Sequence, residues 1–409
     1  MMRCSIVPFI LTIISLTSAA VETTAEVLPG VDVLVRDHAK ELQGKRVAIL
    51  TNPTGVDRRL NHTIDLVRAI PGVEVVRLFA PEHGLRGGYY AGEKVDESKD
   101  PVSGLPIASL YGNSRRPTAE LLAGLDVVLY DIQDVGNRHY TFISTLTYMM
   151  EACEKAGSAV WVLDRPEPMG GHIVGGPMLD AELVSFIGIH PMPEVYGMTP
   201  GEFARMIQAE RTPKLDLRVI KAEGWKRGMN YGQLGWVWVS PSQHIPRWES
   251  CYFYSMTGTI GELGRVSEGV GTPLPFELIG APWMDGVKLA KEMNSRGLEG
   301  VLFRPATFAP RYGRFKGKTC QGVQIHLTQV SSVNPPLVGL ELMSAMNRLY
   351  AGQKVFAGRG EANLFLQALG DRRLAEHLSA GGDPRDHLER IRVEIDRFRA
   401  RRQKYLLYE

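Results

Sequence analysis

Two patterns of apolar and polar positions alternate along the first half of the chain. Apolar runs of strand length occur at 45–52, 74–79, 105–112, 126–134 and 159–166. Apolar residues at helical spacing fill the segments between most of these runs, at 61–70, 117–124 and 141–156. Strands that alternate with helices predict an α/β fold, with a mostly parallel, doubly wound sheet covered on both faces.

The second half of the chain has a weaker pattern. Residues 215–223 predict a strand that completes the first sheet, and residues 236–254 form a loop-rich stretch with many aromatic side chains. Aromatic rings stack on sugars, but they also pack between domains. The stretch therefore predicts either a sugar-binding surface or a domain interface. The terminal segment 404–409 is expected to pack onto the core. Further helices are predicted at 198–210, 336–350 and 386–401.

Polar side chains follow four of the predicted strands. They are Asn52, then Glu82 with His83, then Asp131 with Gln133 and Asp134, and finally Asp164 with Arg165. In an open parallel sheet, ligands bind outside the carboxyl ends of the strands, so these groups are expected to meet along one edge. The alternative is that they cap helices and close loops. The first strand ends in TNPTG, which lacks the glycine spacing of a dinucleotide-binding turn.

The composition is that of a globular protein of ordinary charge. The chain has 409 residues and a formal net charge of +2, and 44% of its residues are hydrophobic. This length suggests two domains. So small a net charge gives no indication of a nucleic-acid or anionic-membrane partner.

The first twenty residues resemble a secretory signal peptide. Arg3 precedes an apolar segment at 6–16, and small residues follow at 18–20. We therefore expect a periplasmic or extracellular protein with no membrane segment after cleavage. The alternative, an uncleaved anchor, needs a longer apolar segment. Beyond this region the chain has Cys153, Cys251 and Cys320, for which we expect three buried thiols rather than one disulfide.

A series of motifs resembles one bacterial family. KRVAILTNPTGVD, FAPEHGLRG, LDVVLYDIQDVGNRHYT, VLDRPEP, YGMTPGE, SEGVGTPLPFE and KYLLY occur in this order, and the match runs from about Leu28 to Tyr408. The series is similar to the exo-β-N-acetylmuramidase family, long carried as a domain of unknown function. The resemblance implies a Rossmann-like domain, placed at 27–240, a smaller α+β domain at 241–409, and an active site in the cleft between them.

The resemblance also implies an activity and a set of residues. The activity is hydrolysis of a non-reducing terminal N-acetylmuramic acid from peptidoglycan fragments, with no cofactor. Glu82 and His83 match the PEHG motif, which points to the acid/base, and Glu268 matches the SEG motif. The other matched residues are Arg86, Glu93, Asp131, Gln133, Asp134, Arg138 and Tyr140. The chain departs from the family where Val270 and Leu274 replace arginines and Gly175 replaces a glutamate.

Glycoside hydrolysis ordinarily uses two carboxyl groups, one of them protonated. Burial at a strand end favours the protonated form of a carboxyl, so Glu82 is the expected acid. Glu268 is the expected second carboxylate, with Asp131 and Asp134 as rivals.

The substrate is expected to contact polar groups near these carboxylates. Three arginines are candidates to pair with a sugar-linked carboxylate: Arg86, Arg138 and Arg165. The alternative for each is an ordinary surface or ion-pair arginine. Asn52 either binds sugar hydroxyls or shapes its turn. The other residues expected to bind substrate are Glu93, Gln133, Asp134 and Tyr140.

Two other classes of function remain open from the sequence. A divalent cation held by Glu82, His83, Asp131 and Asp134 would make a metal-dependent hydrolase. The adjacent Glu–His pair lacks the helical His spacing of zinc motifs, which weakens that hypothesis. A non-catalytic binder of sugars or muropeptides is the other alternative.

Overall fold

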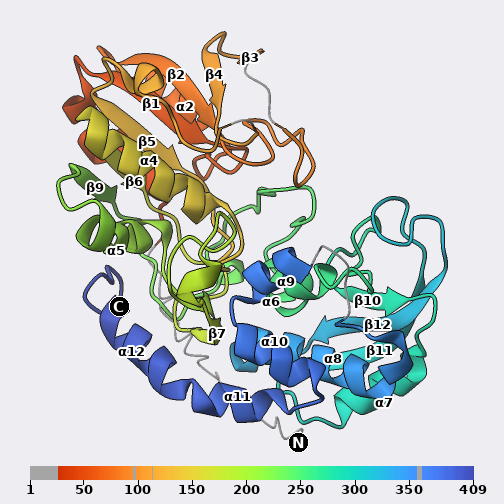
Figure 1. Cartoon of the computed structure of the whole chain (residues 1–409). Coiled ribbons are helices and arrows are strands. Elements are labelled where there is room, and N and C mark those ends of the chain that lie inside the picture. The colour runs from red at the N-terminus through yellow and green to blue at the C-terminus, as the bar shows by residue number, and fades with distance from the viewer. Residues whose placement is uncertain (1–25, 95–97, 113, 357–361) are drawn as a thin grey trace, which may run out of the picture.

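The computed structural model describes residues 26–94, 98–112, 114–356 and 362–409, and these form two lobes (Figure 1). The predicted signal peptide at 1–20 lies outside the described residues. The first lobe contains a seven-stranded sheet in the order β3-β4-β2-β1-β5-β6-β9. Its strands are β1 (Arg46–Thr51), β2 (Glu74–Ala80), β3 (Ser98–Lys99), β4 (Pro106–Ser109), β5 (Val127–Asp131), β6 (Ala159–Leu163) and β9 (Leu217–Ile220). Every pairing is parallel except that of β3 with β4, which confirms the predicted sheet.

The central strands of the sheet bury alternate residues against helices on opposite faces. In β1, Val47 and Ile49 belong to one apolar cluster, and Ala48 and Leu50 belong to another. Such burial on both faces explains why the strands are continuous apolar runs. The helices on the first face are α1 (Gly30–Val33) and α2 (Thr63–Arg68). Those on the second face are α3 (Ala119–Leu122), α4 (Phe142–Ala156) and α5 (Pro200–Arg211).

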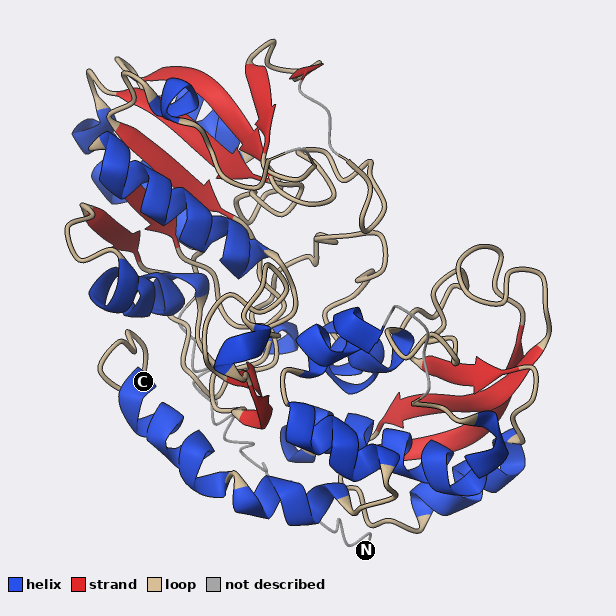
Figure 2. Ribbon diagram, viewed as in Figure 1, coloured by secondary structure: helices blue, strands red, loops and turns tan. Residues whose placement is uncertain are grey.

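The second lobe has a small antiparallel sheet with helices packed on it (Figure 2). Its strands are β10 (Leu278–Ala281), β11 (Val301–Phe308) and β12 (Cys320–Leu327), and β12 is the central one. Its helices are α6 (Ser250–Gly261), α7 (Gly286–Asn294), α8 (Pro335–Leu349), α9 (Ala362–Leu369) and α10 (Arg372–Ser379). A two-stranded ribbon of β7 (Gly175–Met178) and β8 (Pro193–Val195) comes between β6 and β9 along the chain.

Helix α6 is not predicted from the sequence. Nine of its twelve residues are buried, so it lacks the polar face that produces a recognisable helical period. It packs closely on α8, because a Cβ on Gly339 would lie 2.2 Å from the carbonyl oxygen of Met256. Only glycine permits this backbone approach.

The C-terminal segment returns from the second lobe to the first. The predicted helix at 386–401 is in fact two helices, α11 (Pro384–Arg390) and α12 (Arg392–Arg402), because the backbone at Ile391 turns to φ −89° and ψ 1°. The tail beyond α12 packs onto the first lobe, as predicted. The Tyr408 hydroxyl donates to buried Asp164 at 2.6 Å, and the Leu407 N–H donates to Glu202 at 2.8 Å.

The three cysteines that lie in the described residues are buried free thiols, which confirms the expectation. Within the part of the chain that the structure describes, no helix is both long and apolar enough to span a membrane.

Tyr408→Phe is expected to lower the free energy of unfolding by about 1–3 kcal/mol, because two buried hydrogen bonds lose a partner. The Tyr408 hydroxyl donates to Asp164 and accepts from the Ala222 N–H at 3.0 Å. Tyr350→Phe is the matched control, since the Tyr350 hydroxyl also makes two hydrogen bonds, to backbone atoms of Asp285, but in an exposed setting. Urea unfolding measures both, and equal losses would contradict the anchoring role of the tail.

Candidate active site

A cleft of about 560 Å³ lies between the two lobes, and both lobes line it. From the first lobe it is lined by Glu82, His83, Tyr90, Tyr111, His139, Tyr140 and Thr141. From the second lobe it is lined by Tyr254, Glu262, Glu268, Val270, Phe276, Tyr312 and Arg314. Ser242 and His244 come from the segment that joins β9 to α6. The cleft therefore unites Glu82, His83, Tyr140 and Glu268, four of the residues expected from the sequence.

Glu82 follows strand β2 in the turn Pro81–Gly84 and is 8% exposed. One carboxylate oxygen accepts the Gly92 N–H at 3.1 Å, and the other accepts the Thr141 hydroxyl at 2.6 Å. Thr141 immediately precedes helix α4, so the loop after β2 and the start of α4 both hold Glu82. These two contacts fix the position of the carboxylate at the wall of the cleft.

His83 is held in a strained backbone conformation beside Glu82. Its φ is 69°, in the left-handed region that residues other than glycine rarely adopt. Its Nδ1 lies 3.1 Å from the carbonyl oxygen of Tyr89, which can only accept, so Nδ1 is the donor. In the neutral ring Nε2 is therefore free to accept a hydrogen bond or a proton. Strain of this kind persists where surrounding contacts enforce it, commonly at functional sites.

Glu268 enters the cleft from the loop between α6 and β10, against helix α6. A Cβ on Gly261 would lie 2.9 Å from the Glu268 carboxyl carbon, so this glycine makes room for the carboxyl. Burial raises the pKa of Glu268 to about 7, and the negative charge of Glu262 adds to this rise, whereas the positive charge of Arg314 opposes it. Glu268 is consequently a carboxyl that carries a proton in a large fraction of molecules at neutral pH.

Aromatic rings from both lobes form the floor of the cleft. Tyr254 of α6 packs edge-to-face on Tyr140 and on Phe276, with centroids 5.4 and 4.9 Å apart. The Tyr254 hydroxyl lies 2.8 Å from Nδ1 of His139. Burial lowers the pKa of His139, although Glu194 opposes this effect, so the His139 ring favours its neutral form. The floor joins the lobes and separates the cleft from the interior.

Asp131 and Arg165, both expected near the site, bind each other below the sheet edge. Arg165 donates Nε–H and Nη2–H to the two oxygens of Asp131, at 2.6 and 3.0 Å. The hydroxyl of Thr63 also donates to this carboxylate. Neither Asp131 nor Arg165 lines the cleft. Asp131 is fully buried, so this bidentate pair holds strand ends together rather than facing a substrate.

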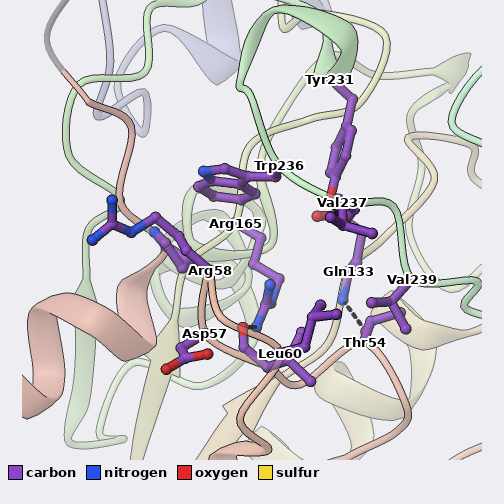
Figure 3. A pocket seen from close by; sticks show the side chains of 12 residues that line it. Thr54, Asp57, Arg58, Leu60, Gln133, Arg165, Tyr231, Trp236, Val237 and Val239 are labelled. Carbon is purple, nitrogen blue, oxygen red and sulfur yellow. Dashed lines mark hydrogen bonds between the residues drawn. The ribbon is translucent and has the colours of Figure 1, made fainter.

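The crevice between the ends of β1 and β5, where such sheets often bind ligands, is closed by side chains (Figure 3). Tyr231 and Trp236 stand beside Arg165 and Gln133, and the remaining cavity is about 20 Å³. That volume accommodates about one water molecule and no sugar. Gln133 donates its amide hydrogens to the carbonyls of Asp134 and Pro166.

Asn52 and Asp134 have structural partners as well. Asn52 accepts hydrogen bonds from the N–H and the hydroxyl of Thr54, which shapes the turn after β1. Asp134 accepts from the Tyr196 hydroxyl and the Gly136 N–H, and burial raises the pKa of Asp134 to about 6. These are among the residues expected to bind substrate, and the structure places them outside the cleft lining.

Arg138, also expected to bind substrate, is fully buried. Its guanidinium donates to the carbonyls of Pro177, Met192, Ala368 and Leu369. Because these backbone groups belong to three separate segments, the last of them in α9, Arg138 ties the two lobes together. The expected contact with a sugar carboxylate does not fit this burial.

Arg86 and Glu93 support the loop that carries Glu82. Arg86 forms a bidentate pair with Asp100 at 2.9 and 3.0 Å. Glu93 accepts the Tyr90 N–H at 2.8 Å. Neither Arg86 nor Glu93 lines the cleft, so these contacts brace the loop from outside it.

The four residues considered as metal ligands do not converge. Glu82 and His83 face the cleft, whereas Asp131 pairs with Arg165 and Asp134 with Tyr196. Among the residues that the structure describes, no group of three or more His, Cys, Asp or Glu side chains is arranged to hold a metal ion.

Several cleft residues are not predicted from the sequence. His139 stands in the NRHYT motif between two expected residues, so the motif was the signal that could have found it. Glu262 and Arg314 lie outside the motifs, on segments without a distinctive pattern. Their place in the cleft depends on how the second lobe folds.

Comparisons with known proteins agree with this architecture. The family model described as "Exo-beta-N-acetylmuramidase NamZ, N-terminal" matches residues 47–249, and its C-terminal counterpart matches residues 252–408. A curated relative from Bacillus subtilis (strain 168), named peptidoglycan beta-N-acetylmuramidase NamZ, is 38% identical over 94% of this chain and 92% of its own length.

Two solved structures of DUF1343 family proteins from Bacteroides fragilis NCTC 9343 share the fold. The first is 38% identical with a TM-score of 0.87, and the second is 28% identical with a TM-score of 0.76. Each match covers 94% of this chain and 99% of the other. The α/β fold, the two-carboxyl cleft and these matches define a glycosidase. The chain belongs to the exo-β-N-acetylmuramidase NamZ family.

Gly261→Ala is expected to lower kcat by about 10- to 100-fold, because the new methyl group displaces the Glu268 carboxyl. The substitution should not weaken the fold, since alanine favours a helix more than glycine does. Gly228→Ala is the control, because a Cβ there meets nothing within 4 Å. Hydrolysis of a chromogenic β-N-acetylmuramide and thermal unfolding measure the two effects. Unchanged turnover in Gly261→Ala would contradict the proposed fit of Glu268 against α6.

Proposed function

We propose that this protein is a secreted, exo-acting hydrolase that releases non-reducing terminal N-acetylmuramic acid from peptidoglycan fragments. The observation that carries the proposal is that Glu82 and Glu268, from different lobes, face one cleft in a member of this family. The name of the Bacillus subtilis relative supports peptidoglycan as the source of the substrate.

The geometry assigns roles to the two carboxyl groups. Glu268, with a pKa raised to about 7, suits the proton donor to the leaving oxygen. Glu82, whose oxygens both accept hydrogen bonds, suits the carboxylate that acts at the anomeric carbon or on the attacking water. From the sequence, Glu82 was the expected acid and Glu268 the expected second carboxylate. The two residues exchange these roles here, because the pKa of Glu268 is the raised one. His83 lies beside Glu82, where Nε2 is available to a sugar hydroxyl or a water.

Contacts between the lobes at the rim of the cleft support exo action. Tyr90 of the first lobe lies 5.4 Å from Tyr312 of the second, measured between ring centroids. His244 stacks on Tyr312, and its Nε2 lies 3.1 Å from the Tyr312 hydroxyl. Contacts that bridge the cleft at this point obstruct a glycan chain that continues past them, which favours a terminal sugar.

The activity is tested with a chromogenic β-N-acetylmuramide. Glu82→Gln and Glu268→Gln are each expected to lower kcat by about 100-fold or more, the usual contribution of such groups. Glu262→Gln, the same change on a third cleft carboxyl, is the control and should retain activity within about tenfold. A folded wild type that releases no N-acetylmuramic acid from the chromogenic substrate or from muropeptides would contradict the proposal.

The pH profile tests the assignment of the acid. Because the donor must be protonated, kcat/KM is expected to fall as pH rises through about 7, the value to which the pKa of Glu268 is raised. The residual rate of Glu268→Gln should lack this decline. In Glu262→Gln the decline should move to lower pH, since a charge that raises the Glu268 pKa is gone. A wild-type rate that increases through pH 7 would contradict the role of Glu268.

Secretion is tested on the full-length chain. The n-region with Arg3, the apolar segment 6–16 and the small residues 18–20 support export and cleavage. The mature protein recovered from the periplasm or medium should begin near Val21. An intact N-terminus on a protein confined to the cytoplasm would contradict this part of the proposal.

A further inference from the structure

The charges in the cleft are strongly unequal. Among the described residues that line it, Glu82, Glu262 and Glu268 carry carboxyl groups, whereas Arg314 is the one lysine or arginine. The substrate of the proposed function carries a carboxylate on its lactyl ether. An anion that enters a cleft with three carboxyl groups requires a cation to hold it. Among the described lining residues, Arg314 is the side chain with this permanent positive charge.

Arg314 belongs to the loop between β11 and β12, and this loop is fixed against the segment that carries Glu268. The Arg311 N–H donates to the Gly271 carbonyl at 2.7 Å, and a Cβ on Gly271 would lie 2.2 Å from the Tyr312 carbonyl oxygen. Such close packing requires glycine at this position and holds the two segments together. Arg314 is thus placed by backbone contacts and does not depend on a flexible loop.

The guanidinium of Arg314 is only partly satisfied. Its Nη1–H donates to the Gly264 carbonyl at 2.6 Å. Its Nε is buried and lacks a hydrogen-bond partner within the described residues, and Arg314 forms no ion pair there either. One bond anchors the group, which leaves the rest of its donor fork for a ligand. A guanidinium fork matches a carboxylate in bidentate geometry.

We propose that Arg314 binds the lactyl carboxylate of N-acetylmuramic acid and makes the cleft selective for this sugar over N-acetylglucosamine. The proposal rests on the proposed function for the identity of the sugar. Val270 lines the cleft beside this loop, its Cγ1 3.6 Å from where a Cβ of Gly313 would lie, and offers no charge of its own. Arg314 supplies the positive charge at this wall instead.

Binding at Arg314 also acts on Glu268. The charged groups that influence the Glu268 pKa are Arg314, which lowers it, and Glu262, which raises it. A lactyl carboxylate that pairs with Arg314 offsets the positive charge, so the proton on Glu268 is held more firmly once the correct sugar is bound. Recognition of the lactyl group and preparation of the proton donor are coupled through one arginine.

Binding of the free sugars tests the proposal independently of turnover. Calorimetry at pH 6 with wild type, Arg314→Gln and Arg314→Lys measures the Kd of N-acetylmuramic acid and of N-acetylglucosamine. Arg314→Gln is expected to weaken binding of N-acetylmuramic acid by about 10- to 100-fold and to change binding of N-acetylglucosamine by less than about threefold. Arg314→Lys should recover part of the loss. Arg311→Gln, an exposed arginine in the same loop whose contact uses only backbone atoms, is the matched control.

Two results would overturn the inference. If Arg314→Gln weakened the binding of both sugars equally, Arg314 would act only by supporting the structure. If Arg314→Gln left the binding of N-acetylmuramic acid unchanged, the lactyl carboxylate would bind at another group. Selective binding by a wild type that does not hydrolyse the chromogenic muramide would contradict the proposed function alone.

Discussion

The packing of Tyr254 against His139 and Tyr140 is the contact on which the site depends. Tyr254 belongs to helix α6 of the second lobe, whereas the other two residues precede α4 in the first. The approach is close, since a Cβ on Gly258 would lie 3.0 Å from the Tyr254 ring and 3.2 Å from His139. Edge-to-face aromatic pairs contribute about 0.5–1.5 kcal/mol each beyond the burial of their surface. This contact brings Glu268, which rests on the same helix, into the cleft that Glu82 occupies.

Two further constraints keep the lobes in place. Arg138 donates to backbone carbonyls of Pro177, Met192, Ala368 and Leu369, so truncating its side chain would remove four buried hydrogen bonds. The tail after α12 returns to the first lobe, where Tyr408 contacts Asp164. The second lobe is thus tied to the first through α9 and through the C-terminal tail.

The use of the sheet edge is unusual for a doubly wound fold. The crevice between β1 and β5 is closed by Trp236, Tyr231 and the pair of Asp131 with Arg165. The site lies instead at the end of β2, the neighbour of β1, where the loop after Glu82 leaves room for the second lobe. The parallel sheet therefore serves as a rigid support, and the chemistry takes place between domains.

Much of the fold was predictable from the sequence, since the central strands β1, β5 and β6 are apolar runs, and Gly124 and Gly157 mark the ends of α3 and α4. The site was only partly predictable. Four strand ends carry polar residues. The sequence does not show that Asp131 pairs with Arg165, 34 positions away, or that this pair is buried. Nor does it show that Arg138 points inward while its neighbours His139 and Tyr140 face the cleft. The positions of helix α6 and of Arg314 depend on packing within the second lobe. Such packing produces no local pattern in the sequence.

The most direct test of the central claim is a crystal structure with N-acetylmuramic acid bound. The account predicts that the sugar lies in the cleft between the carboxyl groups of Glu82 and Glu268, with the cavity beside Arg165 and Trp236 unchanged. A sugar bound at that second cavity, or one in contact with only one of the two lobes, would contradict the claim that both domains build a single active site.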